Sequence, residues 1–498
     1  MKRFIFTFCL ALIAFVSIKA ESFTGDIVVT FNGEDYQTVV TVNITPNDNG
    51  LYDMELIVPD MLTVNMYDVP AAQNGDVTVY SAVRDVETPY GAMRTTLFAR
   101  SVDGMAAANL AIEQYGVTMW FNTVGDHFQL PNSNFEAWAA NTGEPDRWHG
   151  FESASGTYAS TSAGLASLEQ SEDVREGVEG HSAVMTAGSL FGIVANGTMT
   201  NGRLNAGSMS ATSTSNNASM DNSSTSTDAN GDLFYMPLYA KPDKFNVWLK
   251  YTQGTINAEN KANVSVKTFD GTYYQEPVNK TYTNLSGSIV GGQVPAGDWT
   301  QYSFPFDYDS YAANNAASEA IFVTFSTNGN PGQGSKNDAL YVDDIELVYL
   351  ADMTDLRYKG VTIDGWDPAV TAYDMQFAAV PDLDDFTADV TGASAVVTKS
   401  IEQNEDGTYR FAISAVPGDL LNATCYVITA TVNATYKRGD VNNDGTVNIS
   451  DVTTLIDYLL SGNSEGINLQ AADVDENTAI NISDVTSLID MLLSGSAN

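Results

Sequence analysis

The chain has 498 residues, a length that predicts about three or four domains. Hydrophobic residues make up 44% of it, which is enough to build packed cores and argues against global disorder. The formal net charge of −40 argues against binding to nucleic acid or to anionic lipid, because phosphate recognition needs clustered Lys and Arg. It is compatible with cation binding. The two cysteines, Cys9 and Cys425, are too few for a disulfide scaffold.

Residues 1–20 have the organisation of a signal peptide. Lys2 and Arg3 precede an apolar run over residues 4–16, and the small residue Ala20 marks the expected cleavage site. The run is too short to span a bilayer, and no later stretch approaches the necessary length. We therefore expect a secreted protein, extracellular or associated with the cell surface, with no membrane span.

Residues 21–126 read as about eight short strands with turn signals between them, which predicts a closed β-barrel. Residues 23–30 and 37–44 are rich in β-branched residues, and Asn32 with Gly33 supplies a turn. This strand pattern and the run over residues 23–33 resemble the calycin-like barrel domains of secreted Bacteroidales proteins. Barrels of that family often enclose a small ligand, but the interpretation that we favour here is a barrel filled by its own side chains.

Residues 127–350 form the largest unit, and their strong strands predict a β-sandwich of jelly-roll type. Inside it, residues 208–230 are rich in Ser, Thr and Asn and predict a flexible insert or a long exposed loop. Residues 130–138, 144–148 and 342–345 carry a resemblance to the carbohydrate metabolism domain (PCMD) of the same bacteria.

The two ends of this unit also resemble carbohydrate-binding jelly rolls. That resemblance implies glycan binding and one structural calcium ion, with Asn132, Glu136 and Asp343 as its ligands. The alternative is that Glu136 and Asp343 are exposed or salt-bridged strand residues. Aromatic rings suit the CH faces of sugars, and the candidate stacking residues, each with a core or turn position as its alternative, are Trp148, Tyr273, Tyr274, Trp299 and Tyr302.

Residues 351–436 predict a further small all-β unit, an immunoglobulin-like sandwich, in which Cys425 is expected to be a buried small apolar residue. The fold class that we predict is therefore mainly β and multidomain, ending in a small α-helical module at residues 437–498.

That last module holds an internal repeat. Residues 440–451 recur as residues 473–484, 33 positions later, with oxygen side chains at loop positions 1, 3, 5, 9 and 12. Calcium prefers six to eight oxygen ligands, and a loop with oxygens at alternate positions can surround one ion. With the carbonyl oxygen of position 7, the candidate ligands are Asp440, Asn442, Asp444, Thr446, Asn448 and Asp451 in the first copy, and Asp473, Asp475, Asn477, Ala479, Asn481 and Asp484 in the second.

A helix with one apolar face is predicted after each loop, whereas the segments before the loops, residues 435–439 and 466–472, are predicted not to be helical. The predicted faces consist of Val452, Leu455, Ile456, Leu459 and Leu460, and of Val485, Leu488, Ile489, Leu492 and Leu493. The alternative interpretation of each copy is an acidic turn before a core helix.

The repeat closely resembles a type I dockerin with EF-hand-like loops. The resemblance implies two calcium ions, folding that depends on calcium, and a cohesin domain of a scaffoldin or surface protein as partner. Partner recognition is implied at Ile449 and Ser450 and, identically, at Ile482 and Ser483, so that two binding orientations are expected. Asn477 and Thr478 depart from the pattern, which implies weaker calcium binding in the second loop.

The sequence nominates no catalytic residue. With 62 acidic residues, any carboxylate pair is easily found, and the three histidines lack metal-ligand spacing. Our leading hypothesis is a secreted, carbohydrate-associated protein that binds glycan and attaches to a cohesin through its dockerin. The alternatives are a glycoside hydrolase of polysaccharide catabolism, which acts on O-glycosyl bonds, and a structural surface adhesin.

Overall fold

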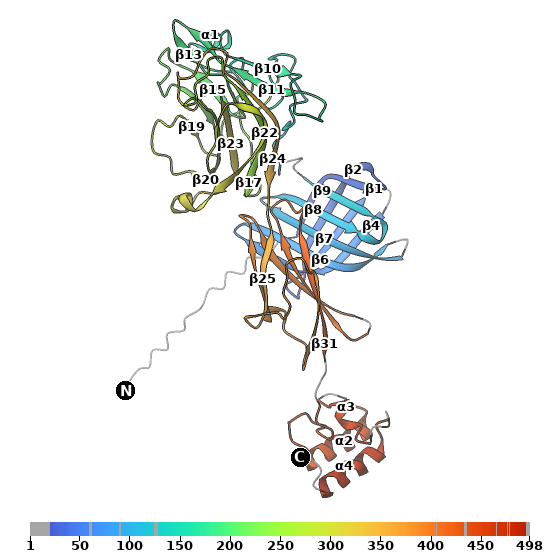
Figure 1. Ribbon diagram of the computed structural model, residues 1–498. Helices are drawn as coiled ribbons and strands as arrows, with labels where there is room; N and C mark the ends of the chain where they lie inside the picture. Colours follow the sequence, from blue (N-terminus) through green and yellow to red (C-terminus); the bar gives the residue numbers. More distant parts are fainter. Residues whose placement is uncertain are drawn as a thin grey trace, which may run out of the picture. The chain divides into compact units, whose positions relative to one another are not determined.

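The computed structural model describes residues 20–58, 62–88, 91–123, 128–404, 406–432, 436–464, 466–475, 477 and 479–494. Strands dominate this part of the chain, and its longest helices lie at the C-terminus (Figure 1), which confirms the predicted fold class. Contacts divide the chain into two compact units, the second of which contains the C-terminal helices. Within the described ranges, no helix has the length and apolar character needed to cross a membrane. The predicted signal peptide, apart from Ala20, lies outside these ranges.

The N-terminal strands form one antiparallel sheet in the order β4-β3-β2-β1-β9-β8-β7-β6-β5. The strands are β1 (Glu21–Phe31), β2 (Glu34–Pro46), β3 (Tyr52–Val58), β4 (Leu62–Val69), β5 (Ala71–Asn74), β6 (Val77–Thr88), β7 (Gly91–Val102), β8 (Met105–Ile112) and β9 (Val117–Asn122), with the short helix η1 (Glu113–Tyr115) before β9. Tight turns join most neighbours, as the alternating sequence pattern predicts.

This sheet closes on itself at Pro70. Only this residue separates β4, which pairs with β3, from β5, which pairs with β6. Proline has no N–H to donate, and its carbonyl oxygen accepts the N–H of Ser81 at 3.3 Å. Side chains fill the interior, where the rings of Tyr52 and Tyr80 meet edge to face at 5.0 Å among buried residues such as Phe23 and Phe121.

The next part of the chain is a sandwich whose main sheet follows the order β10-β11-β24-β17-β22-β20-β18-β23-β14, with β21 paired to β18. The strands are β10 (Ser167–Ser171), β11 (Ser182–Thr186), β14 (Thr198–Thr200), β17 (Lys244–Thr252), β18 (Ala262–Phe269), β20 (Leu285–Ile289), β21 (Gln293–Val294), β22 (Gly297–Asp307), β23 (Ala320–Ser326) and β24 (Ala339–Val348). Smaller elements are α1 (Ala159–Ala163), the hairpin of β12 (Gly188–Leu190) and β13 (Ile193–Ala195), the sheet of β15 (Arg203–Ala206), β16 (Asn216–Met220) and β19 (Tyr274–Glu276), and η2 (Asp309–Asn314).

Strand β22 carries the sheet from one layer to the other. Most of it pairs with β17, and its last residues, Phe306 and Asp307, pair with β20. Alternate residues of β17 are buried, so one face of the strand points into the core. The ring of Phe245 on β17 lies 6.3 Å from that of Phe325 on β23, and this contact belongs to the core between the layers.

The third β region has two sheets, in the orders β26-β25-β28 and β27-β31-β30-β29. Their strands are β25 (Asp352–Tyr358), β26 (Val361–Thr362), β27 (Ala372–Phe377), β28 (Phe386–Thr391), β29 (Val396–Gln403), β30 (Tyr409–Val416) and β31 (Thr424–Val432), with η3 (Leu383–Asp385) before β28. Strands β27 and β31 are parallel. The sequence predicts that Cys425 is buried. In the structure it is only half-buried, at the edge of the core.

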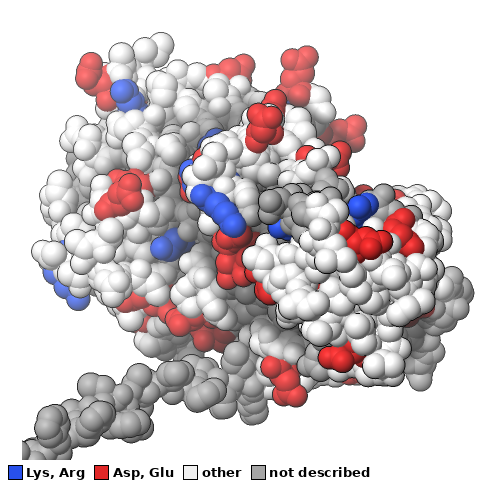
Figure 2. Space-filling view, turned by 90° about the horizontal axis from the view of Figure 1, so that it is seen from below, with Lys and Arg blue, Asp and Glu red and all other residues white. Residues whose placement is uncertain are grey.

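Arg100 on β7 is a buried cation among these elements. Its guanidinium donates to the backbone carbonyl of Tyr239 at 2.6 Å and to that of Gly418, and it lies 5.4 Å from the centre of the Phe128 ring. Burial lowers the pKa of Arg100 to about 10, which still leaves it charged at neutral pH. Figure 2 shows other Lys and Arg side chains scattered among acidic ones on one face.

The C-terminal helices are α2 (Ile449–Ser461), α3 (Leu469–Ala472) and α4 (Ile482–Ser494). Val452 and Leu455 on α2 and Val485 and Leu488 on α4 belong to one small core. The short helix α3 contradicts the prediction that residues 466–472 are not helical. It follows Asn468, whose side chain caps its N-terminus.

Candidate functional site

The first predicted calcium loop is folded around two buried carboxylates. Asp440 accepts the N–H groups of Asp444 and Gly445 at 3.0 and 2.9 Å. Asp451, which is fully buried, accepts those of Asn442 and Asn448 at 3.0 and 2.8 Å, and so joins the loop to the first turn of α2. Two of the side chains predicted as ligands, Asp440 and Asp451, therefore hold the loop together by accepting its backbone N–H groups.

The second loop repeats this arrangement and brings three carboxylates together. Single oxygens of Asp473, Asp475 and Asp484 all lie within 4.8 Å of one another. Asp484 is fully buried and accepts the N–H groups of Val474 and Asn481, both at 2.8 Å. This clustering supports a cation site in the copy whose sequence departs from the pattern.

Asparagine side chains complete the second loop. Asn477 accepts the N–H of Ala479 at 2.9 Å, and the amide of Asn481 donates to the carbonyl of Ala479 at 2.8 Å. The same carbonyl is the predicted ligand at position 7. Thr478 lies outside the described residues.

The residues predicted to contact a partner are exposed at equivalent places of the two copies. Ile449 and Ile482 have 69% and 70% of their surfaces exposed. Ser450 and Ser483 lie beside them at the starts of α2 and α4, and their N–H groups bond to the capping Asn of each helix. Each copy therefore presents a similar apolar and hydroxyl surface.

The predicted apolar faces are only partly packed. Val452, Leu455, Val485 and Leu488 are buried, and Leu459 and Leu492 pack against the same core. Leu460 and Leu493, however, are 82% and 81% exposed, so these two members of the apolar faces lie outside the core. Ile456 and Ile489 are each 36% exposed. The exposed residues again occupy equivalent places in the repeat.

Two of the three calcium candidates in the sandwich carry charges that act on each other. Asp343 is 2% exposed, and its pKa is raised to about 7 by burial, by the charge of Asp344 and by that of Glu136. Arg175 lies 3.5 Å away and opposes this rise only in part. Glu136 accepts the backbone N–H of His181 at 2.8 Å and contacts its ring nitrogen at 3.0 Å.

The third candidate, Asn132, uses its amide within its own loop. The amide nitrogen donates to the carbonyls of Ala137 and Asp146, and the amide oxygen accepts the N–H of Ala137 at 3.0 Å. Glu136 and Asp343 each lie in an ion pair, with His181 and Arg175 respectively, as the alternative interpretation predicted, and calcium binding there stays a prediction.

The aromatic residues predicted to stack on sugars do not form one platform. Trp148 and Tyr274 are 0% and 2% exposed, which contradicts a role as open stacking surfaces. Tyr302 stacks on Phe304 and packs against the core. Tyr273 is 41% exposed, and the half-buried Trp299 donates to Asp173 at 3.0 Å, so these two remain candidates.

Instead, the structure has a groove that the sequence did not reveal. It has a volume of about 550 Å³ and is lined by parts of β14, β15, β16, β18 and β23 and by the hairpin β12–β13. Six side-chain amides line it, together with hydroxyl and apolar groups: Asn196, Asn205, Asn216, Asn217, Asn263 and Asn328. We call this the amide groove. Part of its wall comes from residues 208–218, within the segment that was predicted to be an insert or exposed loop.

Two amides of the groove have unused hydrogen-bonding capacity. The side-chain oxygen of Asn196 and the side-chain nitrogen of Asn328 are buried and have no hydrogen-bond partner. An unpaired buried acceptor or donor is unfavourable unless a ligand or water satisfies it. Both atoms have almost no accessible surface, so they lie behind the wall of the groove rather than on it.

Phe191 lies at the tip of the hairpin β12–β13, between Leu190 and Ile193, which both line the groove. Its side chain is 88% exposed, and its φ of 52° lies in the left-handed region. Bulky residues rarely adopt this conformation, and turns that need it favour Asn, Asp or Gly. Neither stability nor burial explains a phenylalanine at this place.

Comparison with known proteins agrees with the geometry of the C-terminal module. Residues 438–493 match the family model of the dockerin type I domain. No curated protein matches the chain. The match confirms the resemblance inferred from the repeat, whereas the calycin-like and PCMD resemblances remain predictions.

Solved structures give only distant similarities. The chain is similar to the CBM22-1 xylan-binding domain of Paenibacillus barcinonensis Xyn10C, at 13% identity over 43% of this chain and 88% of that one, with a TM-score of 0.20. It is similar to the CBM22-1–CBM22-2 tandem domain of the same protein, at 11% identity over 65% of this chain and 92% of that one, with a TM-score of 0.20. It is also similar to the M60 catalytic domain with two CBM51 domains from Clostridium perfringens ZmpB. The identity is 9% over 82% of this chain and 36% of that one, with a TM-score of 0.15. These scores are too low to support conclusions, and the assignment that stands is that the chain carries a dockerin type I domain at residues 438–493.

Proposed function

We propose that this is a secreted, modular protein that retains glycan through its sandwich and attaches to a cohesin-bearing partner through its dockerin. The observation that carries the attachment is the matched pair of loops, each closed by a buried aspartate and followed by a helix. The family match at residues 438–493 supports it. The partner is a cohesin domain of a scaffoldin or of a surface protein.

Each dockerin loop binds one calcium ion in this proposal. The loops offer carboxylate, amide and carbonyl oxygens, which are the ligands that calcium prefers. A third, structural calcium ion binds near Glu136 and Asp343, where the charges of two carboxylates already act on each other. Calcium at these places offsets part of the strong negative charge of the chain.

The cohesin binds either copy of the repeat. Ile449 with Ser450 and Ile482 with Ser483 present the same pair of groups at two equivalent helix starts. If one copy is mutated to alanine at both positions, the other copy still binds, and affinity for a cohesin falls only about twofold, as expected when one of two equivalent modes is lost. Mutation of all four residues abolishes binding.

This proposal is tested with the full chain and an array of purified type I cohesin domains, in calcium and in EDTA. We expect one or more cohesins to bind in calcium only. Complete loss of binding after mutation of Ile449 and Ser450 alone would show that a single face is used. Absence of binding to any cohesin, in a preparation that binds two or more calcium ions by calorimetry, would contradict the attachment role.

Glycan retention is assigned to the amide groove. The observation that carries it is a groove of about 550 Å³, large enough for a short oligosaccharide, with six side-chain amides in its lining. Phe191 offers an exposed ring at the edge, and aromatic faces suit the CH surfaces of sugars. Neutral amides and hydroxyls suit an uncharged glycan.

The composition of the groove favours binding over hydrolysis. Among the residues that line it, Glu276 is the one carboxylate, whereas most glycoside hydrolases use two at a defined separation. The hydrolase and adhesin alternatives are distinguished by a glycan array with the full chain, with retained glycans analysed by mass spectrometry. Retention of an intact glycan supports the proposal, release of a shorter product supports a hydrolase, and no retention supports an adhesin.

A further inference from the structure

A buried histidine in the sandwich has two neighbouring carboxylates and no hydrogen bond. His149 is fully buried, and neither of its ring nitrogens has a hydrogen-bond partner. Its Nδ1 lies 3.8 Å from Oδ2 of Asp228, which is too long for a hydrogen bond. Burial lowers the pKa of His149 to about 4, so the ring is neutral at pH 7. The carbonyl of Leu233 lies near enough to affect that pKa, yet no hydrogen bond of normal geometry forms.

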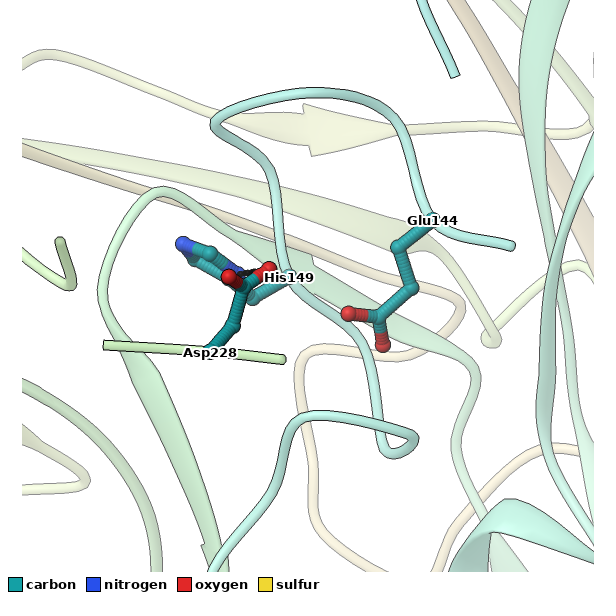
Figure 3. Close-up of side chains that lie close together, drawn as sticks. All are labelled: Glu144, His149 and Asp228. Carbon is teal, nitrogen blue, oxygen red and sulfur yellow. Dashed lines mark ion pairs between the residues drawn. The ribbon is translucent and has the colours of Figure 1, made fainter. Parts of the chain in front are cut away.

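The two carboxylates approach His149 from different segments, as Figure 3 shows. Glu144 is 1% exposed, and one of its oxygens accepts the N–H groups of Gly150 and Glu152 at 2.7 and 3.1 Å. Glycine at position 150 permits this approach, because a Cβ there would lie 3.0 Å from the same oxygen. The carboxylate of Glu144 is therefore held in a fixed position.

Asp228 is held in the same way by the turn that follows it. One carboxylate oxygen accepts the N–H groups of Asn230 and Asp232 at 2.8 and 2.9 Å, and the side chain is 3% exposed. The other oxygen accepts the side-chain amide of Asn230 at 3.0 Å and lies 3.8 Å from Nδ1 of His149. Single donor atoms of Glu144, His149 and Asp228 all lie within 4.8 Å of one another.

We propose that Glu144, His149 and Asp228 bind one zinc ion that fastens residues 144–153 to the turn at residues 228–232. Zinc binds imidazole nitrogen and carboxylate oxygen at about 2.0–2.2 Å, which places tetrahedral ligand atoms about 3.4 Å apart. The separation between Nδ1 of His149 and Oδ2 of Asp228 is 3.8 Å, and all three separations are at most 4.8 Å, so metal binding draws the donor atoms together by at most about 1.4 Å. A water molecule or backbone carbonyl completes the coordination.

The chemistry of the three donors favours zinc over calcium. A hard cation such as calcium prefers oxygen ligands only, whereas imidazole is a preferred ligand of zinc and other transition metals. Two buried carboxylates beside a neutral imidazole leave two negative charges, which one divalent cation neutralises. The hydrogen bonds from backbone N–H groups to both carboxylates are the orienting contacts that metal ligands require.

A simple His–Asp pair is the alternative explanation, and it accounts for less. Such a pair would have a direct hydrogen bond between Nδ1 and the carboxylate, which the 3.8 Å separation does not provide. The carboxylate of Glu144 also accepts the N–H and the hydroxyl of Ser153, so it holds residues 150–153 in place whether or not a metal ion is bound.

The test uses the full chain with millimolar calcium present throughout, so that calcium occupies the dockerin loops. Zinc chloride is titrated by calorimetry, and bound zinc is measured by mass spectrometry after gel filtration. We expect one zinc ion per chain in the wild type. Asp228→Asn keeps an acceptor for the turn but loses a charged ligand, and we expect its zinc affinity to fall at least about 100-fold.

Glu152→Gln is the matched control, since it removes an exposed carboxylate from the same loop and leaves the backbone N–H groups unchanged. It should bind zinc as the wild type does. His149→Gln should lose zinc binding. If His149→Gln does not fold, Asp228→Asn still provides the test. Cobalt offers a second measurement, because its visible absorption reports a tetrahedral site with a nitrogen ligand. Equal zinc binding by the wild type, Asp228→Asn and Glu152→Gln, or no zinc binding by the wild type, would overturn the proposal.

Discussion

The buried carboxylate of Asp484 should be essential for the fold of the dockerin, and Asp484→Asn is the change that tests this. The aspartate accepts N–H groups of Val474, Asp475 and Asn481 at 2.8, 3.2 and 2.8 Å. An asparagine has the same shape but replaces one oxygen with an NH₂ group. Whichever way the amide is turned, at least one buried N–H then faces a donor.

The size of the effect follows from these contacts. A buried donor without a partner costs about 1–3 kcal/mol, and each remaining bond loses about 1 kcal/mol when its acceptor is no longer charged. The sum is about 3–5 kcal/mol, whereas a module of this size has a free energy of unfolding of roughly 3–8 kcal/mol. Removal of a calcium ligand adds to the loss, because calcium that binds only the folded module stabilises it. We expect the variant to unfold α4 in calcium, as EDTA does in the wild type.

Hydrogen–deuterium exchange of the full chain, read by mass spectrometry, measures this locally. Peptides from residues 473–494 should lose protection in Asp484→Asn, while peptides from the barrel serve as an internal reference. Asp490→Asn removes the same charge from an exposed position of the same helix and should behave like the wild type. If exchange in Asp484→Asn stays within about fivefold of the wild type, a difference of about 1 kcal/mol, the reasoning is refuted.

Three further changes test other parts of the structure. Phe191→Asn suits the left-handed backbone better, so it should raise the melting temperature slightly while glycan retention on the array falls; unchanged retention would exclude the ring from the site. Asp343 should lower the unfolding free energy, measured without divalent ions, as pH rises from about 4 to 7, because folded Asp343 keeps its proton to about pH 7 while the unfolded form loses it near 4. Asp343→Asn should remove this contribution, so the difference in unfolding free energy between wild type and variant should change over this pH range. Arg100→Met leaves two buried carbonyls without a donor and should lower the free energy of unfolding, measured by calorimetry, by about 2–4 kcal/mol. Arg94→Met, at a partly exposed ion pair, should lower it by less than about 1 kcal/mol. Equal losses in the two variants would contradict the role of burial.

The dockerin could be predicted because its information is local. Oxygen side chains at alternate loop positions and an apolar period after them occur within one short repeat, so no distant contact is needed to recognise them. The short helix α3 escaped prediction because four residues are too few to show a period, although Asn468 supplied a capping signal. The exposure of Leu460 and Leu493 could not be read from the pattern, since an apolar stripe is the same whether the core or a partner covers it.

The sequence predicts the strands of the barrel and the sandwich, but it does not predict which side chains face the core and which face a ligand. Alternation of apolar residues gives the strands, whereas closure of the barrel depends on one proline between β4 and β5. Trp148 and Tyr274 show this limit of sequence-based prediction most clearly. The position of an aromatic residue in the sequence does not say whether its ring faces the core or a ligand. The amide groove combines asparagines from five separate strands and loops, and each is unremarkable in its own segment.

The segment rich in Ser, Thr and Asn connects the two sites proposed for the sandwich. Its first half lines the amide groove, and its second half carries Asp228, next to His149. A metal ion that holds the turn at residues 228–232 would therefore also restrict the strand β16 that precedes it and the groove wall that this strand forms. The order of the groove wall and the occupancy of the metal site are then linked, although no atom of Glu144, His149 or Asp228 lines the groove. The pairing of β16 with β15 and β19 already orders the first half of the segment, and the metal ion would add a second point of attachment at its end.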